Sequence, residues 1–342
     1  MGDNRSLPQM KGENSDYFDN IVMPLVRDRH SEILQDASVM ILGSVGLGND
    51  DELSDVEAVF YLPSEIWKEK GAWLQLTLDQ CLRETNPWKQ ENGSILCVHP
   101  LSWLLDTRGE GILADDGTVP WEELSFESLF TLQANPIYHD PQNRLGRLRE
   151  MTAPSQMPEN RWKKTLYTRL NDFVECGVCD IRRSVDRELY SEAHIQFGRA
   201  VQNLFEMGFL ACHQYYPYLK HLRWAFGRLP PPISNSAAEF DLLSVATDWQ
   251  EKTDILEAIY DAFRDYIVSN SVLPEIDFDR IDLHNNGFID ELIFSGRFGA
   301  WDNPDWRSNI TKYKEQAVKN GFETDQWGIF QLWGTDWICT KS

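Results

Sequence analysis

Two carboxylates stand two residues apart at the start of an apolar run. Asp55 and Glu57 flank Val56, and side chains alternate between the faces of a strand, so both acids are expected on one face, with Val56, Ala58 and Phe60 turned toward a core. Two like charges about 4 Å apart repel by roughly 4 kcal/mol at an effective dielectric of about 20. A divalent cation removes that repulsion, and hard carboxylate oxygens suit Mg²⁺. The spacing predicts a site for Mg²⁺, or Mn²⁺, held by Asp55 and Glu57.

Gly43 and Ser44 end the preceding apolar run, Val39–Leu42, and open a Gly-rich, acidic loop. Gly43 lets the backbone come close to an anion, and Ser44 offers both an N–H group and a hydroxyl. A phosphate-binding turn at the end of one strand, next to metal-binding carboxylates on the following strand, suits nucleotide transfer. We therefore predict that Gly43 and Ser44 bind nucleotide phosphates, together with Ser54 at the end of the loop.

The pattern Gly43-Ser44, a short loop and Ser54-Asp55-Val56-Glu57 resembles the signature of the polymerase-beta-like nucleotidyltransferase superfamily. Its spacing is that of the antibiotic and minimal nucleotidyltransferases. The resemblance implies a small mixed sheet flanked by helices, an NTP substrate with ATP as the expected nucleotide, and Mg²⁺-dependent transfer of a nucleoside monophosphate to a hydroxyl.

One feature of that family is missing from the third predicted strand, Ile95–His99. The resembling enzymes carry a third carboxylate there, which often serves as general base and metal ligand, whereas this strand has none. His99 is the candidate catalytic residue in its place. Three interpretations stay open: a base supplied by another element, substitution by His99, or a protein that binds nucleotides without catalysis.

Apolar periodicity predicts an α+β chain of two domains, in keeping with a length of 342 residues. A linker at Pro154–Glu159 separates a mixed α/β pattern from a purely helical one, a bundle of long helices. The expected divisions are a flexible arm at 1–16, a nucleotidyltransferase-like domain at 17–153, a helical domain at 160–275, and a Trp-rich segment at 276–342 that packs on the helical domain.

The segment Tyr216–Trp224 mixes aromatic residues with Lys220, His221 and Arg223, the most basic patch in an acidic chain. Lys220 and Arg223 are predicted to contact the triphosphate or the base. The alternative is that these cations complement a helix end and surface acids.

The net charge of −22 disfavours long nucleic acid as a partner and would attract a cationic small acceptor. No apolar run approaches the roughly 20 residues of a membrane-spanning helix, and residues 1–16 do not form a signal peptide, so a cytoplasmic protein is expected. The pair Cys176 and Cys179 is a lone CxxC, which predicts two structural thiols. A homodimer is left open.

Three functions follow from these observations. The first is a nucleotidyltransferase that acts on a small, cationic, antibiotic-like acceptor. The second is a catalytically inactive nucleotide sensor, which the absence of the third acid motivates. The third is an antitoxin-type nucleotidyltransferase that modifies a protein or RNA partner.

Overall fold

The computed structural model describes residues 17–50, 54, 56–85, 95–105, 119–274, 276, 278–281 and 283. The chain divides into two compact units, Met1–Met157 with Tyr215–Trp224, and Pro158–Gln214 with Ala225–Ser342. The sequence-based division placed all of 160–275 in the helical domain, whereas the structure groups Tyr215–Trp224 with the first unit. The predicted arm and nearly all of the predicted Trp-rich segment lie outside the described residues.

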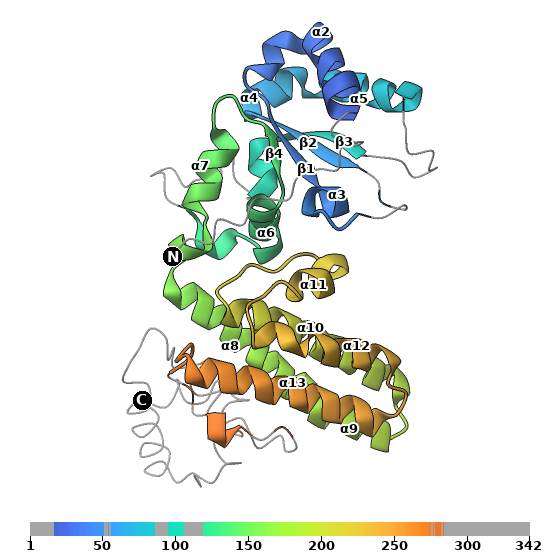
Figure 1. Ribbon diagram of the computed structural model, residues 1–342, viewed down its shortest axis with the longest axis vertical. Helices are drawn as coiled ribbons and strands as arrows, with labels where there is room; N and C mark the ends of the chain where they lie inside the picture. Colours follow the sequence, from blue (N-terminus) through green and yellow to red (C-terminus); the bar gives the residue numbers. More distant parts are fainter. Residues whose placement is uncertain are drawn as a thin grey trace, which may run out of the picture. The chain divides into compact units, whose positions relative to one another are not determined.

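The first unit is built on a mixed sheet of four strands in the order β3-β2-β1-β4 (Figure 1). The strands are β1 (Ser38–Leu42), β2 (Glu57–Leu62), β3 (Ile95–Pro100) and β4 (Ile137–His139). β1 pairs antiparallel with both β2 and β4, and β2 pairs parallel with β3. With the helices, this sheet gives the α+β fold that the sequence predicts.

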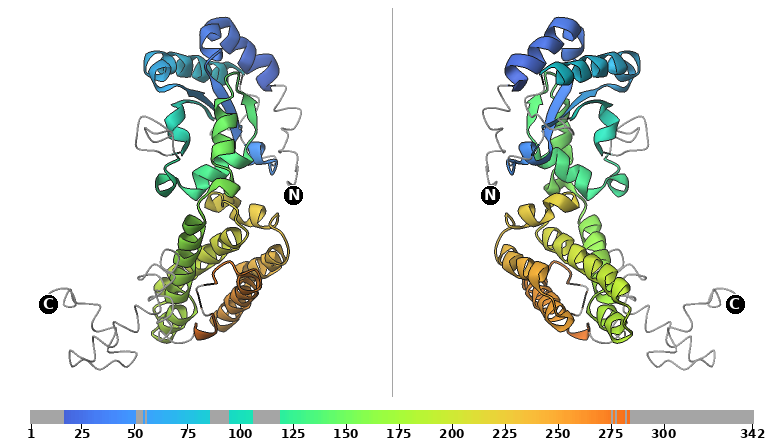
Figure 2. Two further views of the ribbon diagram at one scale, coloured as in Figure 1. Left: turned by 90° about the vertical axis from the view of Figure 1, so that its left-hand side faces the viewer. Right: turned by 90° about the vertical axis from the view of Figure 1, so that its right-hand side faces the viewer.

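One face of the sheet forms the core of the first unit. The residues that alternate toward it are buried together with apolar residues of the helices α2 (Met23–Leu34) and α5 (Ala72–Thr85). The strand residues in this core are Val39, Ile41, Ala58, Phe60, Leu62, Leu96 and Val98, and Val56, which directly precedes β2, joins them. In Figure 1, α2 and α5 lie above the sheet, and Figure 2 shows both helices at the same end of this unit. The opposite face therefore carries Glu57 and its alternate neighbours on β2.

One helix of the first unit lies where the sequence predicted a loop. This short helix, α3 (Gly43–Leu47), begins at Gly43, which has φ +65°, and is followed by Gly48, which has φ +71°. The helix α4 (Ser64–Ile66) begins directly after β2, and Pro63 precedes it without a side-chain cap. Glycine tolerates the left-handed backbone at both ends of α3, which lets a helical turn fit between two strands.

The remaining short elements of this unit surround the sheet. They are η1 (Phe18–Val22), η2 (Trp67–Gly71), η3 (Leu101–Leu105), η4 (Trp121–Glu123), α6 (Phe126–Ala134), α7 (Arg144–Met151) and η5 (Pro154–Gln156). Asp140 accepts hydrogen bonds from the backbone N–H groups of Arg144 and Gly146 at 2.9 and 3.0 Å, and from Ser38 Oγ at 2.7 Å. These bonds satisfy the first turn of α7, so Asp140 has a structural role.

The second unit is a helical bundle around α10 (Tyr190–Ala211), which packs against α8, α9 and α13. Its other elements are α8 (Glu159–Cys176), α9 (Val178–Asp186), η6 (Ile233–Ser236), α12 (Ala237–Val245), α13 (Trp249–Ser269) and η7 (Phe278–Arg280). The helix α11 (Leu219–Phe226) begins in the first unit and its last residues are grouped with the second. Gly177 separates α8 from α9. Among the described residues, no helix is long and apolar enough to cross a membrane.

Two glycines of α10 allow a direct test of packing in this bundle. A Cβ at Gly208 would lie 2.5 Å from Phe226 Cε2, whereas a Cβ at Gly198 would have no heavy atom within 4 Å. Gly208→Ala is expected to lower the free energy of unfolding by about 1–2 kcal/mol through overpacking. Gly198→Ala is expected to raise it by about 0.5–1 kcal/mol through helix propensity.

Urea unfolding of the two full-length variants and the wild type measures both changes. Equal stability of the two variants would show that α10 does not approach Phe226 as described.

Candidate functional site

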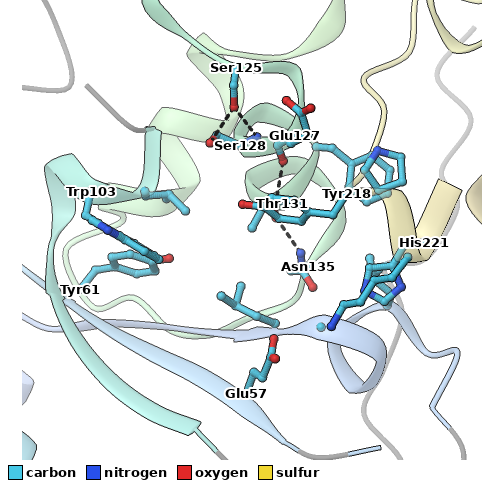
Figure 3. Close-up of a pocket in the computed structure, with 17 residues that line it drawn as sticks. Glu57, Tyr61, Trp103, Ser125, Glu127, Ser128, Thr131, Asn135, Tyr218 and His221 are labelled. Carbon is cyan, nitrogen blue, oxygen red and sulfur yellow. Dashed lines mark hydrogen bonds between the residues drawn. The ribbon is translucent and has the colours of Figure 1, made fainter. Parts of the chain in front are cut away.

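A cavity of about 450 Å³ lies on the face of the sheet opposite the core, within the first unit. Leu42, Glu57 and Tyr61 of the sheet form its floor, and α6 covers it (Figure 3). Trp103 and Leu104 of η3 lie on one side, and residues 217–221 lie on the other. Side chains from four parts of the chain that are distant in sequence therefore meet around one space.

Gly43 and Glu57, both singled out by the sequence, are in contact at this cavity. A Cβ built on Gly43 would lie 2.7 Å from Glu57 Oε2, and Gly43 adopts φ +65°. Only glycine combines that left-handed backbone with so close an approach of a carboxylate. The glycine thus leaves room for the acid, which rises from the sheet toward α6 in Figure 3.

The other predicted residues of the motif are distributed differently. Asp55 lies outside the described residues, so its position relative to Glu57 stays a prediction. Ser44 is the second residue of α3 and its carbonyl accepts from Asn49 N at 3.0 Å, but neither Ser44 nor Ser54 is among the residues that line the cavity.

The basic segment contributes Lys220, but not Arg223, to the lining. It is anchored to the first unit by the Tyr215 hydroxyl, which donates to the Thr152 carbonyl at 2.9 Å, and by the Tyr216 ring, which stacks on Phe126 at 5.2 Å with an interplanar angle of 7°. The segment that carries Lys220 is therefore held in place by contacts with α6 and with the end of α7, and Lys220 lines the cavity.

His99, the predicted substitute for the third acid, stacks on the indole of Trp103, with ring centroids 4.0 Å apart and an interplanar angle of 12°. Burial lowers the pKa of His99. Trp103 lines the cavity and His99 does not, so the imidazole supports an aromatic wall of the site. Cys97, two residues earlier on the same face of β3, is a thiol whose pKa is raised by burial and by the nearby Asp79 and Glu57.

Asn135 is held in one orientation at the end of α6. Its side-chain Nδ2 donates to the Thr131 carbonyl at 2.9 Å, and its backbone carbonyl accepts from the Arg149 guanidinium. With the amide nitrogen used in this way, Oδ1 is the atom left to accept a hydrogen bond, and it lies close to Gly46 of α3. Asn135 therefore brings to the lining an acceptor oxygen that is unpaired among the described residues.

Three buried polar atoms of the cavity lining have no hydrogen-bond partner among the described residues. They are Tyr61 Oη, Asn135 Oδ1 and His221 Nε2. A buried polar atom that is left unpaired destabilises a fold by about 1–3 kcal/mol, so native structures rarely keep several in one place. Three such atoms among the residues of one cavity favour a ligand with hydrogen-bonding groups at this site.

The charges of the described lining are mixed. Glu57 and Glu127 supply two carboxylates, and Lys220 supplies one ammonium. His221 stays neutral at pH 7, because burial and the neighbouring Lys220 lower its pKa. Burial likewise raises the pKa of the Tyr61 phenol, so that group remains protonated.

The described residues contain no cluster of three or more His, Cys, Asp or Glu side chains that could hold a metal ion. Mg²⁺ does not need such a cluster, because it is commonly held by one or two carboxylates, water and substrate phosphates. The Glu57 carboxylate, lodged in the space that Gly43 leaves, is a suitable hard oxygen donor for that cation.

Most of the cavity's cover was not found from the sequence. Trp103, Glu127 and Asn135 line it with Ser125, Ser128 and Thr131, and none of these belongs to a recognisable motif. A partial signal existed at α6, where Ser125 Oγ caps the helix by accepting from Ser128 N at 3.1 Å. That signal identifies a helix start, but it does not say which face of the sheet the helix covers.

Comparison with known proteins gives few further constraints. Residues 121–224, less than half of the chain, match the family described as "Domain of unknown function (DUF4037)". That stretch contains α6 and residues 217–221 of the cavity, but neither Gly43 nor Glu57. No curated protein matches the chain.

Among solved structures, a nucleotidyltransferase-like protein from Exiguobacterium sibiricum 255-15 is similar over 88% of this chain and 92% of that chain. The sequence identity is 10% and the TM-score is 0.35.

Proposed function

We propose that the first unit catalyses Mg²⁺-dependent transfer of a nucleoside monophosphate from an NTP, with ATP as the expected donor, to a hydroxyl of a small acceptor. The observation that carries this proposal is the contact of the Glu57 carboxylate with Gly43 at the floor of a cavity that Lys220 also lines. A carboxylate, a glycine turn and a cation are the groups that metal-assisted phosphoryl chemistry requires together.

Glu57, with Asp55, would hold the cation, which when bound would offset the negative charge that develops on the transferred group. The turn at Gly43 and Ser44 would approach the phosphates, and Lys220 would contribute one further positive charge to the polyphosphate. Trp103 and Tyr61 offer apolar surface on one side of the cavity, where an acceptor or a base could lie away from water.

The acceptor is proposed to be a small molecule, because the site is a cavity of about 450 Å³. The net charge of −22 and the two carboxylates of the lining are compatible with a cationic acceptor. An antitoxin-type activity on a protein or RNA is the variant of this proposal in which the acceptor is a macromolecule.

A nucleotide sensor without transferase activity is the second candidate. The observation that favours it is the absence of a carboxylate from the described strand β3. On the face of the sheet opposite the core, this strand carries Cys97 and His99. A protein with this cavity could bind a nucleotide and still lack the base for transfer.

Two measurements on the full-length protein separate these functions. Isothermal titration with ATP is expected to give binding that depends on Mg²⁺, because the polyphosphate needs a counter-charge beside Glu57. A panel of small hydroxyl compounds, with cationic and neutral members, is then screened for pyrophosphate release from ATP. Release that depends on an acceptor supports the transferase, binding without release supports the sensor, and absence of Mg²⁺-dependent binding rejects both.

A further inference from the structure

The transfer reaction needs a group that takes the proton of the acceptor hydroxyl, and β3 does not provide one. Cys97 is a half-buried thiol whose pKa is raised, and His99 is stacked on Trp103 outside the lining. The base must therefore come from another element of the cavity. Of the described lining residues, His221, Glu57 and Glu127 carry groups that can accept a proton near pH 7.

His221 has the geometry of a proton acceptor. The side chain is 6% exposed and lines the cavity, and Nε2 has no hydrogen-bond partner among the described residues. Its backbone N–H donates to the Tyr218 carbonyl at 2.9 Å, within the segment that Tyr215 and Tyr216 anchor. The His221 ring is thus carried by an anchored segment, and its Nε2 is unpaired among the described residues.

The charges around this imidazole keep it in the form that can accept a proton. Burial and Lys220 lower the pKa of His221, so the ring is neutral above its usual pKa of about 6.5. The titratable and charged groups that share the cavity are Glu57 on β2, Glu127 on α6, Tyr61 on β2, and Tyr218 and Lys220 on its own segment.

Asn135 and Tyr61 indicate what kind of acceptor would reach this imidazole. Asn135 Oδ1 can only accept a hydrogen bond, and the Tyr61 hydroxyl and His221 Nε2 also lack partners among the described residues. A compound that carries several hydroxyls can donate to Asn135 and His221 at once and accept from Tyr61.

We propose that His221 is the general base of this chain, in place of the absent third carboxylate, and that the acceptor is a polyhydroxylated compound. This inference rests on the proposed nucleotidyl transfer. In the step, the acceptor O–H bond breaks and its proton moves to His221 Nε2, while the freed electron pair forms the bond to the α-phosphorus of the NTP. The bond from the α-phosphorus to the bridging oxygen breaks, and pyrophosphate leaves with that electron pair.

The test compares the wild type, His221→Gln and Glu127→Gln as full-length proteins, with ATP, Mg²⁺ and glycerol in excess as the polyol. His221→Gln is expected to lower the rate of pyrophosphate release by about 10²–10⁴-fold, the range of a lost general base. Binding of a non-hydrolysable ATP analogue, measured by titration calorimetry, is expected to stay within a few-fold of the wild type. Glu127→Gln removes the other candidate base of the lining and is expected to lower the rate less than His221→Gln does.

The pH dependence distinguishes a base from a structural side chain. The wild-type rate is expected to rise with pH through the lowered pKa of His221, below about 6.5, and then to level off, because only the neutral ring accepts the proton. In His221→Gln that rise disappears.

Each failure has its own signature. If the wild type releases pyrophosphate and His221→Gln does so at the same rate, or with the same pH dependence, His221 is not the base. A comparable loss in Glu127→Gln alone would assign the base to Glu127. If the wild type binds ATP but releases no pyrophosphate with glycerol or with any acceptor, the proposed function itself fails and the base has no reaction to serve.

Discussion

Glu57→Gln is expected to reduce Mg²⁺-dependent nucleotide transfer by at least about two orders of magnitude, with little change in stability. The carboxamide has the same shape and can keep its packing against Gly43, but it lacks the charge that holds the cation. Loss of one electrostatic stabiliser of a transition state lowers the rate by about 10²–10³-fold. The measurements are pyrophosphate release, Mg²⁺-dependent ATP binding by calorimetry, and urea unfolding.

Asp55→Asn is expected to act in the same direction, because the sequence assigns both acids to one cation. Glu65→Gln is the matched control, since its side chain is 84% exposed and pairs with Lys68 at 3.0 Å on α4 and η2. That control should stay within about two-fold in rate, as surface substitutions usually do. Full activity in either Glu57→Gln or Asp55→Asn would remove that residue from the metal site.

Gly43→Ala is also expected to lower the rate of nucleotide transfer strongly. This substitution changes the position of the Glu57 carboxylate and leaves its charge unchanged. An alanine at φ +65° destabilises by about 1–2 kcal/mol. Its Cβ would lie 2.7 Å from Glu57 Oε2, so the end of that flexible side chain must move. A displacement of about 1 Å in a reacting group can lower a rate by about 10²-fold, so a loss of that size is expected in pyrophosphate release.

A double-mutant cycle identifies the cause of that loss. If Gly43→Ala acts by displacing the Glu57 carboxylate, the double variant Gly43→Ala with Glu57→Gln should transfer no more slowly than Glu57→Gln alone. Additive losses would mean that the glycine has an independent role, such as approach of the backbone to phosphate. Gly198→Ala, which meets nothing within 4 Å, controls for a general effect of alanine and should leave the rate unchanged.

Local patterns were sufficient for the elements of the sheet. Alternation along 56–62 predicted that Val56, Ala58 and Phe60 face a core, and all three are buried with the helices α2 and α5. Strands and helices show apolar side chains at periods of about 2.0 and 3.6 residues, and such a period can be read from a short stretch of a single sequence. The short helix α3 escaped prediction because its five residues, Gly43–Leu47, are too few to show a period.

The residues that close the candidate site could not be predicted in the same way. Glu127, Asn135 and His221 follow Glu57 at distances of 70 residues or more along the chain, and no spacing rule relates them. His221 was noted only as part of a basic patch, and both its burial and the lack of a partner for Nε2 among the described residues emerged only from the tertiary structure.

Local patterns in the chain were enough to predict the α+β class, the strands that flank the glycine turn, and the pairing of that turn with a carboxylate as the candidate chemistry. The three-dimensional packing was needed to show which face of the sheet has a cavity, that His99 stacks on Trp103, and that His221 lines the cavity. Side-chain alternation and helix periods act over a few residues, whereas the lining of a cavity depends on which distant segments pack together.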